Sequence, residues 1–233
     1  MPATLVPSAI GHEILDDPAA DPRHVRRMLG DIARSNRWFG GIRSLHRGLR
    51  RLLPFGGGGT VTTLLDVGTG AGDLPRAAVR WGARHRHPVR ALGLERHDAA
   101  ARLATELGTP TLVGCGGTLP LADRTVDLVL LSQLLHHLDD ASAIRLLTEA
   151  DRVARLGVIV LDLQPSRLAA GAFRLVGPVL RFDPATTSDG LVSLARGRTA
   201  PALVALANAA GVVSPHAEQL MMARVVMTWR VTR

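Results

Sequence analysis

The fold is decided by a glycine-rich stretch in the first third of the chain, which runs Asp66-Val67-Gly68-Thr69-Gly70-Ala71-Gly72-Asp73. It follows the apolar, β-branched run of residues 61–67, which is typical of a buried parallel strand. Because glycine has no Cβ, its backbone can turn sharply and approach a ligand closely. The stretch therefore predicts a strand, a tight loop that contacts a nucleotide-like cofactor, and a helix that begins near Asp73.

The spacing of the glycines distinguishes this loop from a dinucleotide-binding loop. A dinucleotide fingerprint reads G-x-G-x-x-G, but here the third glycine is Gly72, and Asp73 fills the place where that glycine would stand. Asp73 puts a negative charge at a helix N-terminus, where a pyrophosphate would otherwise bind, and Asp66 adds another at the strand end. These charges disfavour phosphate and favour a ligand that carries an ammonium and a sulfonium.

A second acidic position follows the next apolar run, where Glu95 ends Leu92-Gly93-Leu94-Glu95. A carboxylate there can accept two hydrogen bonds from a ribose diol, as in sites for S-adenosyl-L-methionine (SAM) and for NAD alike. The alternative is an exposed acid at a strand end. The glycine loop upstream favours the ribose interpretation.

Strand-like and helix-like runs alternate along most of the chain. Strands are expected at 61–67, 89–94, 111–113, 126–131 and 158–163, helices at 73–84, 99–107, 141–153 and 200–210, and two last strand-like runs at 216–221 and 224–231. Alternation of this kind implies right-handed crossovers and a parallel sheet. We therefore expect an α/β fold with a seven-stranded, mostly parallel sheet, flanked by helices and closed by a C-terminal antiparallel hairpin.

The N-terminal quarter reads as helical. Residues 1–22 form a loose lead-in, and Asp21-Pro22 is a typical N-cap with a first-turn proline. The helix that follows is interrupted at residues 36–41, and a second basic helix runs to about Leu53.

A break after these helices suggests a division of the chain. Pro54 and the run Gly56–Gly59 form a flexible joint. We expect residues 1–58 to form an N-terminal helical cap or lid and residues 59–233 to form the cofactor-binding domain.

Composition argues against several classes of protein. The single cysteine, Cys115, cannot form an internal disulfide or a thiolate metal site, which favours a reducing cytoplasm. The first twenty residues hold acids and prolines, and no apolar run of about 18 residues occurs, so neither export nor membrane insertion is expected. The net charge is +8 and all 28 basic residues are arginine, but aromatic residues are only 3%, which disfavours nucleic acid as a partner. Oligomeric state stays open.

Four motifs in this order resemble the class I SAM-dependent methyltransferases, over residues 61–163. The glycine loop resembles the acid-x-G-x-G-x-G motif of that family, and Glu95 resembles its ribose-binding acid. Gly114-Cys115-Gly116-Gly117-Thr118-Leu119-Pro120 resembles G-D-A-x-x-L-P, but Cys115 stands where an aspartate commonly contacts the adenine amino group. The run 126–132 and Leu135-His136-His137-Leu138 resemble the fourth strand and the segment after it. The resemblance implies a Rossmann-like fold.

The resemblance also implies which residues contact the cofactor. These residues are Asp66, Gly68, Thr69, Gly70, Gly72, Glu95, Arg96, Cys115, Gly116 and Ser132. More loosely, residues 31–41 resemble bacterial members encoded beside polyketide synthases, which act in secondary metabolism on small aromatic or polyketide products.

Methyl transfer from a sulfonium needs alignment and exclusion of water, and no metal is required. For a hydroxyl acceptor, His136 or His137 is the candidate general base. The resemblance favours His136, because the second histidine of the pair more often packs inward in the family. The alternative is that both histidines only brace their loop.

Three further residues are candidates for contact with the acceptor: Trp38, Phe39 and Asp162. Core packing of the two rings is an equally good interpretation. Ser188-Asp189-Gly190 also fits the acceptor pocket, although a turn is the favoured interpretation of that tripeptide.

The function that these features indicate is SAM-dependent methylation of a small apolar, phenolic or polyketide-type metabolite, on oxygen or, less favoured, on carbon. A nicotinamide-dependent oxidoreductase is the first alternative, opposed by Asp73 and by the lack of tyrosine and lysine in the chain. A SAM-binding protein without catalysis is the second, because retained binding residues do not establish turnover.

Overall fold

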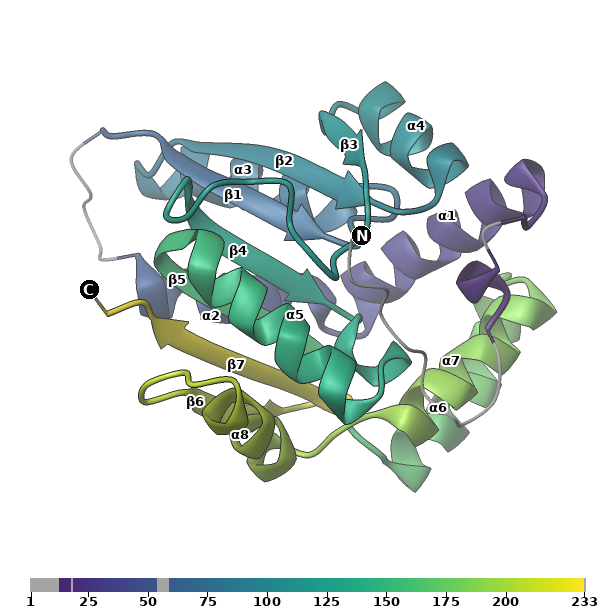
Figure 1. Cartoon of the computed structure of the whole chain (residues 1–233). Helices are drawn as coiled ribbons and strands as arrows, with labels where there is room; N and C mark the ends of the chain where they lie inside the picture. The colour runs from purple at the N-terminus through teal and green to yellow at the C-terminus, as the bar shows by residue number, and fades with distance from the viewer. Residues whose placement is uncertain (1–12, 18, 54–58, 233) are drawn as a thin grey trace.

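A seven-stranded sheet runs through the molecule in the order β3-β2-β1-β4-β5-β7-β6 (Figure 1). The computed structural model describes residues 13–17, 19–53 and 59–232. The strands are β1 Thr62–Val67, β2 Val89–Glu95, β3 Thr111–Val113, β4 Val126–Ser132, β5 Ala154–Leu163, β6 His216–Leu220 and β7 Arg224–Arg230. Strands β1 to β5 pair in parallel, whereas β7 is antiparallel to both β5 and β6. The predicted fold class and closing hairpin are confirmed.

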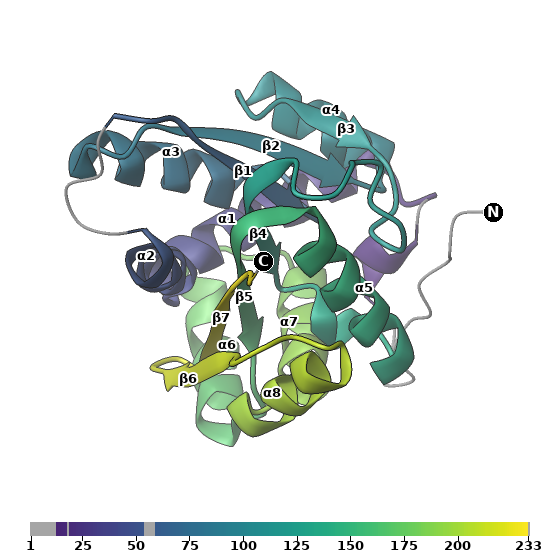
Figure 2. The ribbon, with the colours of Figure 1, turned by 60° about the vertical axis from the view of Figure 1, so that its left-hand side comes forward.

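The helices lie on both sides of this sheet. They are α1 Pro22–Trp38, α2 Gly41–Leu52, α3 Asp73–His85, α4 Asp98–Glu106, α5 Asp140–Val153, α6 Arg167–Val179, α7 Pro184–Arg196 and α8 Ala200–Ala209, with short 3-10 helices η1 Ile14–Asp16 and η2 Leu135–His137. Helices α5 and α8 cover one face, and α2 and α3 cover the other (Figures 1 and 2). Figure 1 shows α1, α6 and α7 at the side toward which β1 and β4 point.

The core follows from the apolar strands. Every residue of β4 from Val126 to Leu131 is buried, because such a central strand has neighbours on both faces. On one face Leu146 of α5 and Leu203 of α8 are fully buried, and on the other Leu49 of α2 joins the cluster that includes Trp81 of α3. Helix α2 thus packs in the same layer as α3, on β5 and β7.

The first N-terminal helix begins where the sequence predicts but runs to Trp38, three residues into the predicted interruption at 36–41, and the second ends close to the predicted Leu53. Asp21 caps α1 by accepting a hydrogen bond from the backbone N–H of Arg23. Gly40, with φ of +84°, separates α1 from α2. The first twelve residues of the predicted lead-in, and Gly56–Gly58 of the predicted joint, lie outside the described residues, and the division between residues 58 and 59 stays a prediction.

The segment between β5 and α8 differs from expectation. It forms two helices, α6 and α7, and Ser188-Asp189-Gly190 lies inside α7, so the predicted turn is wrong. Asp183 accepts a hydrogen bond from Ala185 N, and Pro184 occupies the first turn of α7. Glycine is needed within that helix because a Cβ at Gly190 would lie 2.5 Å from the ring of Phe173 on α6.

Strand β5 is also longer than predicted. It begins at Ala154, directly after α5, because Ala154 pairs with Val126 of β4. In the described part of the chain, no helix is both long and apolar enough to cross a membrane.

Packing of α2 on the sheet gives a test of this fold. A Cβ at Gly48 of α2 would lie 2.6 Å from the buried Ile159 of β5, whereas one at Gly30 of α1 would meet nothing within 4 Å. We expect Gly48→Val to lower the free energy of unfolding by roughly 1–3 kcal/mol. Gly30→Ala, the matched control, should raise it by roughly 0.5–1 kcal/mol. Denaturant titration measures both, and equal effects would contradict the packing.

Candidate active site

A cavity of about 340 Å³ lies at the carboxyl ends of β1, β2, β4 and β5, between the sheet and the helices α1, α6 and α7. Ligands of open α/β sheets bind in this place, because the strand order reverses there and leaves a crevice. The volume is within the usual range for a small-molecule site.

The glycine loop forms one wall of the cavity. Gly70 has a φ of +54°, a conformation that side chains other than glycine rarely adopt, and a Cβ there would lie 3.1 Å from Leu29 of α1. Gly72 also has a positive φ but does not line the cavity, because it caps α3. The loop therefore brings bare backbone to the wall of the cavity, and its contact with a cofactor stays a prediction.

Two acidic groups of this wall are buried. Burial raises the pKa of Asp66 well above its usual range, although a hydrogen bond from Thr69 Oγ1 at 2.8 Å opposes the shift. Burial also raises the pKa of Asp73, which accepts a hydrogen bond of 3.1 Å from Asn36 Nδ2 of α1. Neither carboxyl is matched by a buried basic group at hydrogen-bonding distance within the described residues, so the wall suits a ligand that carries positive charge.

Glu95 ends β2 and is held in place by backbone groups. Its carboxylate accepts hydrogen bonds from Gly70 N at 2.9 Å and His97 N at 3.0 Å. Every other residue predicted to contact the cofactor, except Gly72, lines the same cavity. These residues are Asp66, Gly68, Thr69, Gly70, Arg96, Cys115, Gly116 and Ser132.

His136, which lines the cavity, forms a buried pair with Asp162. His136 lies in η2 after β4, Asp162 lies near the end of β5, and their Nδ1 and Oδ1 atoms are 2.5 Å apart. Burial raises the pKa of Asp162, but the charge of His136 and its hydrogen bond outweigh this, so the pKa lies below its usual value. Within the described residues, Nε2 of His136 is buried and has no hydrogen-bond partner.

The structure reverses the expected order of the two histidines. His136, the first of the pair, is the buried one, and the side chain of His137 is 20% exposed. The reason is Asp162, whose strand lies beside β4 and holds the His136 ring toward the sheet. Both histidines line the cavity.

Of the three residues predicted to contact the acceptor, only Phe39 lines the cavity. Phe39 lines the cavity, and its ring lies 5.5 Å from that of Phe173 on α6. Trp38 does not line the cavity and is 64% exposed, because α1 buries the face that carries Met28 and ends with Trp38 on the outside. Asp162 also does not line the cavity, since its carboxylate lies behind His136.

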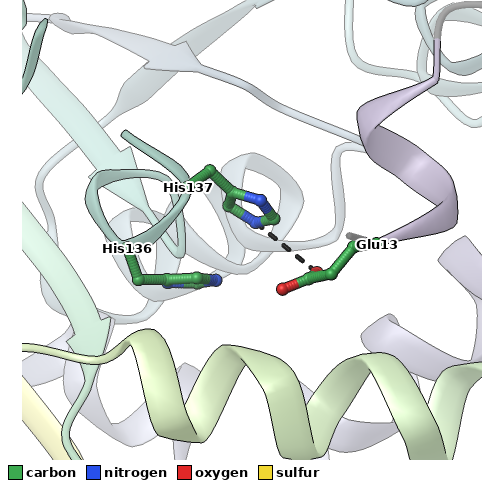
Figure 3. A group of neighbouring side chains, drawn as sticks. All are labelled: Glu13, His136 and His137. Atoms are coloured by element: carbon green, nitrogen blue, oxygen red, sulfur yellow. Dashed lines mark ion pairs between the residues drawn. The ribbon is translucent and has the colours of Figure 1, made fainter. Parts of the chain in front are cut away.

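Glu13 lies beside the two histidines, as Figure 3 shows. Its Oε2 is 3.7 Å from Nε2 of His137, and the candidate ligand atoms of Glu13, His136 and His137 all lie within 4.8 Å of one another. These residue types are metal ligands, so a metal centre is one interpretation of the cluster.

Arg196 argues against that interpretation. Its buried guanidinium lies 3.2 Å from Glu13 Oε1 and 3.3 Å from Nδ1 of His137. A guanidinium only donates hydrogen bonds, so Nδ1 accepts and Nε2 of the neutral ring carries the hydrogen. That nitrogen then has no lone pair for a metal, and a cation would also meet the positive charge of Arg196. The cluster is a polar end wall of the cavity.

Several lining or supporting residues were not predicted from the sequence. Arg224, at the start of β7, is buried and lines the cavity, and burial lowers its pKa to about 10 against the opposing charges of Asp162 and Asp73. Glu13 and Phe173 also line the cavity, and Arg196 supports Glu13. Phe173 lies on α6 and Arg196 lies on α7. The N-cap residues of these two helices, Ser166 and Asp183, are the local sequence signal that could have predicted them.

Comparison with known proteins agrees with this geometry. Residues 65–161 match the family model described as "Methyltransferase domain". No curated protein sequence matches the chain.

Solved structures share the fold at low sequence identity. A SAM-dependent methyltransferase from Thermotoga maritima is 19% identical, with 90% of this chain and 99% of that chain covered and a TM-score of 0.57. One from Aquifex aeolicus is 17% identical, with 91% and 99% covered and a TM-score of 0.60. Human N-acetylserotonin methyltransferase, solved in complex with SAM, is 15% identical, with 93% and 57% covered and a TM-score of 0.62.

The family match covers the glycine loop, Glu95, Cys115, His136 and His137, which are the residues around which the cavity is built. It favours methyl transfer over the nicotinamide-dependent alternative. Residues 65–161 thus form a methyltransferase domain on the fold shared by SAM-dependent methyltransferases, and the cofactor of this enzyme is S-adenosyl-L-methionine.

Proposed function

We propose that the enzyme methylates a hydroxyl group of a small apolar, phenolic or polyketide-type metabolite. The observation that carries this proposal is the buried His136–Asp162 pair, whose unpartnered Nε2 belongs to a residue of the cavity wall. A buried polar atom without a partner costs free energy, which a ligand hydroxyl would recover.

The opposite wall of the cavity suits an apolar acceptor. The rings of Phe39 and Phe173 meet edge to face at 5.5 Å, and Met28 and Ile32 of α1 line the same space. Aromatic rings prefer such edge or offset contacts with another ring. An acceptor with a flat apolar body and one hydroxyl matches both the rings and the histidine.

The two residues of the pair have separate roles in the reaction. The acceptor oxygen forms its bond to the methyl carbon while His136 Nε2 accepts the hydroxyl proton. Asp162 accepts the hydrogen bond from Nδ1–H, which fixes the tautomer that leaves Nε2 free to take a proton, and it stabilises the imidazolium that results. SAM, when bound, supplies a methyl group on a sulfonium, and the electron pair of the broken bond stays on sulfur.

The cofactor end of the cavity uses other residues. In this proposal Glu95 accepts hydrogen bonds from the ribose diol, the backbone from Gly68 to Gly70 lies against the cofactor, and Asp66 and Asp73 face its positive charges. Cys115 and Gly116 line the adenine end, where a thiol replaces the carboxylate common in the family. The enclosing apolar walls keep water from the reacting groups.

Substitution of Glu95 and Gly70 tests how the cofactor is bound. Glu95→Ala should weaken SAM and S-adenosylhomocysteine binding by about tenfold or more, because it removes hydrogen bonds to a charged group. Gly70→Arg should abolish binding, since its side chain would enter the cavity. Isothermal titration calorimetry measures both, with the exposed Glu106→Ala as the matched control. Unchanged affinity in Glu95→Ala would contradict the assignment.

Substitution of His136, Asp162 and His137 tests which residue is the base. With an acceptor found in a panel of phenols, His136→Gln should lower kcat by roughly 10²- to 10⁴-fold while SAM affinity is retained. Asp162→Asn should lower kcat as well, because the tautomer is lost. His137→Gln is the matched control, and its kcat should fall much less. Equal losses in the two histidine variants, or methylation of carbon in the product, would overturn the role of His136.

A further inference from the structure

Helix α6 exposes apolar side chains in a continuous stripe. Leu168 is 86% exposed, Leu175 is 77% exposed and Val179 is 79% exposed. Their spacing of seven and four residues places them on one side of the helix. Gly177 is the only buried residue of α6 within the described chain, so this helix contributes little to the core. A contiguous exposed apolar surface of this kind marks a site of interaction.

Arginines border this stripe. Arg167 and Arg174 are exposed, and each lies about 100° around the helix from the leucine that follows it, whereas Arg181 is exposed just beyond the end of the helix. No acidic residue occurs between Gln164 and Phe182. The exposed side of α6 is therefore apolar along one edge and positively charged along the other.

The end of α1 adjoins this surface and has the same character. Arg34 donates a hydrogen bond of 3.3 Å to the carbonyl of Arg181, and its guanidinium lies 5.6 Å from the centre of the Phe182 ring. Trp38, near Arg34 on α1, is 64% exposed. Exposed tryptophan and arginine beside apolar side chains are typical of surfaces that lie at a lipid headgroup boundary.

We propose that the exposed side of α6, with Arg34 and Trp38 of α1, docks on an anionic lipid bilayer. Leucine, valine and tryptophan side chains enter the headgroup region, and the arginines contact the anionic headgroups, as in an interfacial amphipathic helix. Charge disfavours a second copy of the chain as the occupant, because stacking of two α6 helices would bring their arginines together between two molecules of net charge +8.

Docking on this side also places the cavity next to the bilayer. Ala169, Ala172 and Phe173 on the inner side of α6 line the cavity, so one helix separates the lipid from the acceptor space. An acceptor dissolved in the bilayer would reach His136 past α6. This consequence rests on the proposed function, whereas the docking does not.

Vesicle flotation tests the docking without cofactor or acceptor. The full chain should bind vesicles of phosphatidylcholine with phosphatidylglycerol, and bind vesicles of phosphatidylcholine alone far more weakly. The triple variant Leu168→Ser, Leu175→Ser, Val179→Ser should weaken binding by about tenfold or more, because three apolar anchors are lost. Arg167→Gln with Arg174→Gln should weaken binding to the phosphatidylglycerol vesicles by about fivefold for each charge and so reduce the preference for phosphatidylglycerol.

Matched controls come from the far edge of the sheet, where Leu112 and Val113 of β3 are 53% and 60% exposed. Leu112→Ser with Val113→Ser should leave vesicle binding unchanged, and all variants should keep their SAM affinity, which shows that they fold. Vesicle binding that is absent, or equal in all variants, would overturn the proposal.

Two other partners could bind the exposed side of α6, and each would give a distinct experimental result. Either result would overturn the proposal. A dimer in sedimentation velocity that the triple serine variant dissociates would assign the stripe to a second copy. Binding to duplex DNA that the arginine variants weaken and the serine variants leave unchanged, without vesicle binding, would assign the surface to nucleic acid. None of these outcomes bears on methylation, so the two proposals fail separately.

Discussion

Burial of charge at the carboxyl ends of the strands is the constraint on which the site depends. Moving a carboxylate or guanidinium out of water costs several kcal/mol unless a partner offsets it. Asp162 is offset by His136, and Glu13 is offset by Arg196. Asp66 has a raised pKa because burial disfavours its charged form. Such groups add little to stability, and their concentration around one cavity is what a site that binds and moves charge requires.

The sheet could be predicted because its signals are local. Each strand is a contiguous apolar run, and the turn from β1 to α3 needs glycines at neighbouring positions. Helix α6 was not predicted because a helix with one buried residue shows no alternation between an inner and an outer face. Helix α7 was not predicted because Gly190 resembles a turn residue. Glycine is needed at this position because the ring of Phe173, on another helix, lies where a Cβ would be.

The site residues also divide into those that a local motif indicates and those that depend on contacts between distant parts of the chain. Glu95 and His136 stand next to recognisable motifs, so the sequence indicated them. Other contacts of the site join distant parts of the chain: Glu13 meets Arg196 across 183 residues, and Arg224 donates to the Phe39 carbonyl across 185. A single sequence gives no signal for such pairs, because they depend on which loops the strand order brings to one edge. The sequence suggests Asp162 as an acceptor contact, but its role as the partner of His136 depends on the pairing of β4 with β5.

The elements around the cavity differ in how firmly they are held by the rest of the fold. His136 and Asp162 follow or belong to two central strands, where local opening costs the most free energy. Helix α7 is tied to α1 by Asp31, which accepts hydrogen bonds from Asp183 N and Thr186 Oγ1. Helix α6 has one buried residue, packs on α7, and makes ring contacts through Phe173 with Phe39 and Phe182. The wall between the cavity and the surface is thus formed by a helix with one buried residue, whereas the reacting groups are fixed by buried strands that hold their geometry.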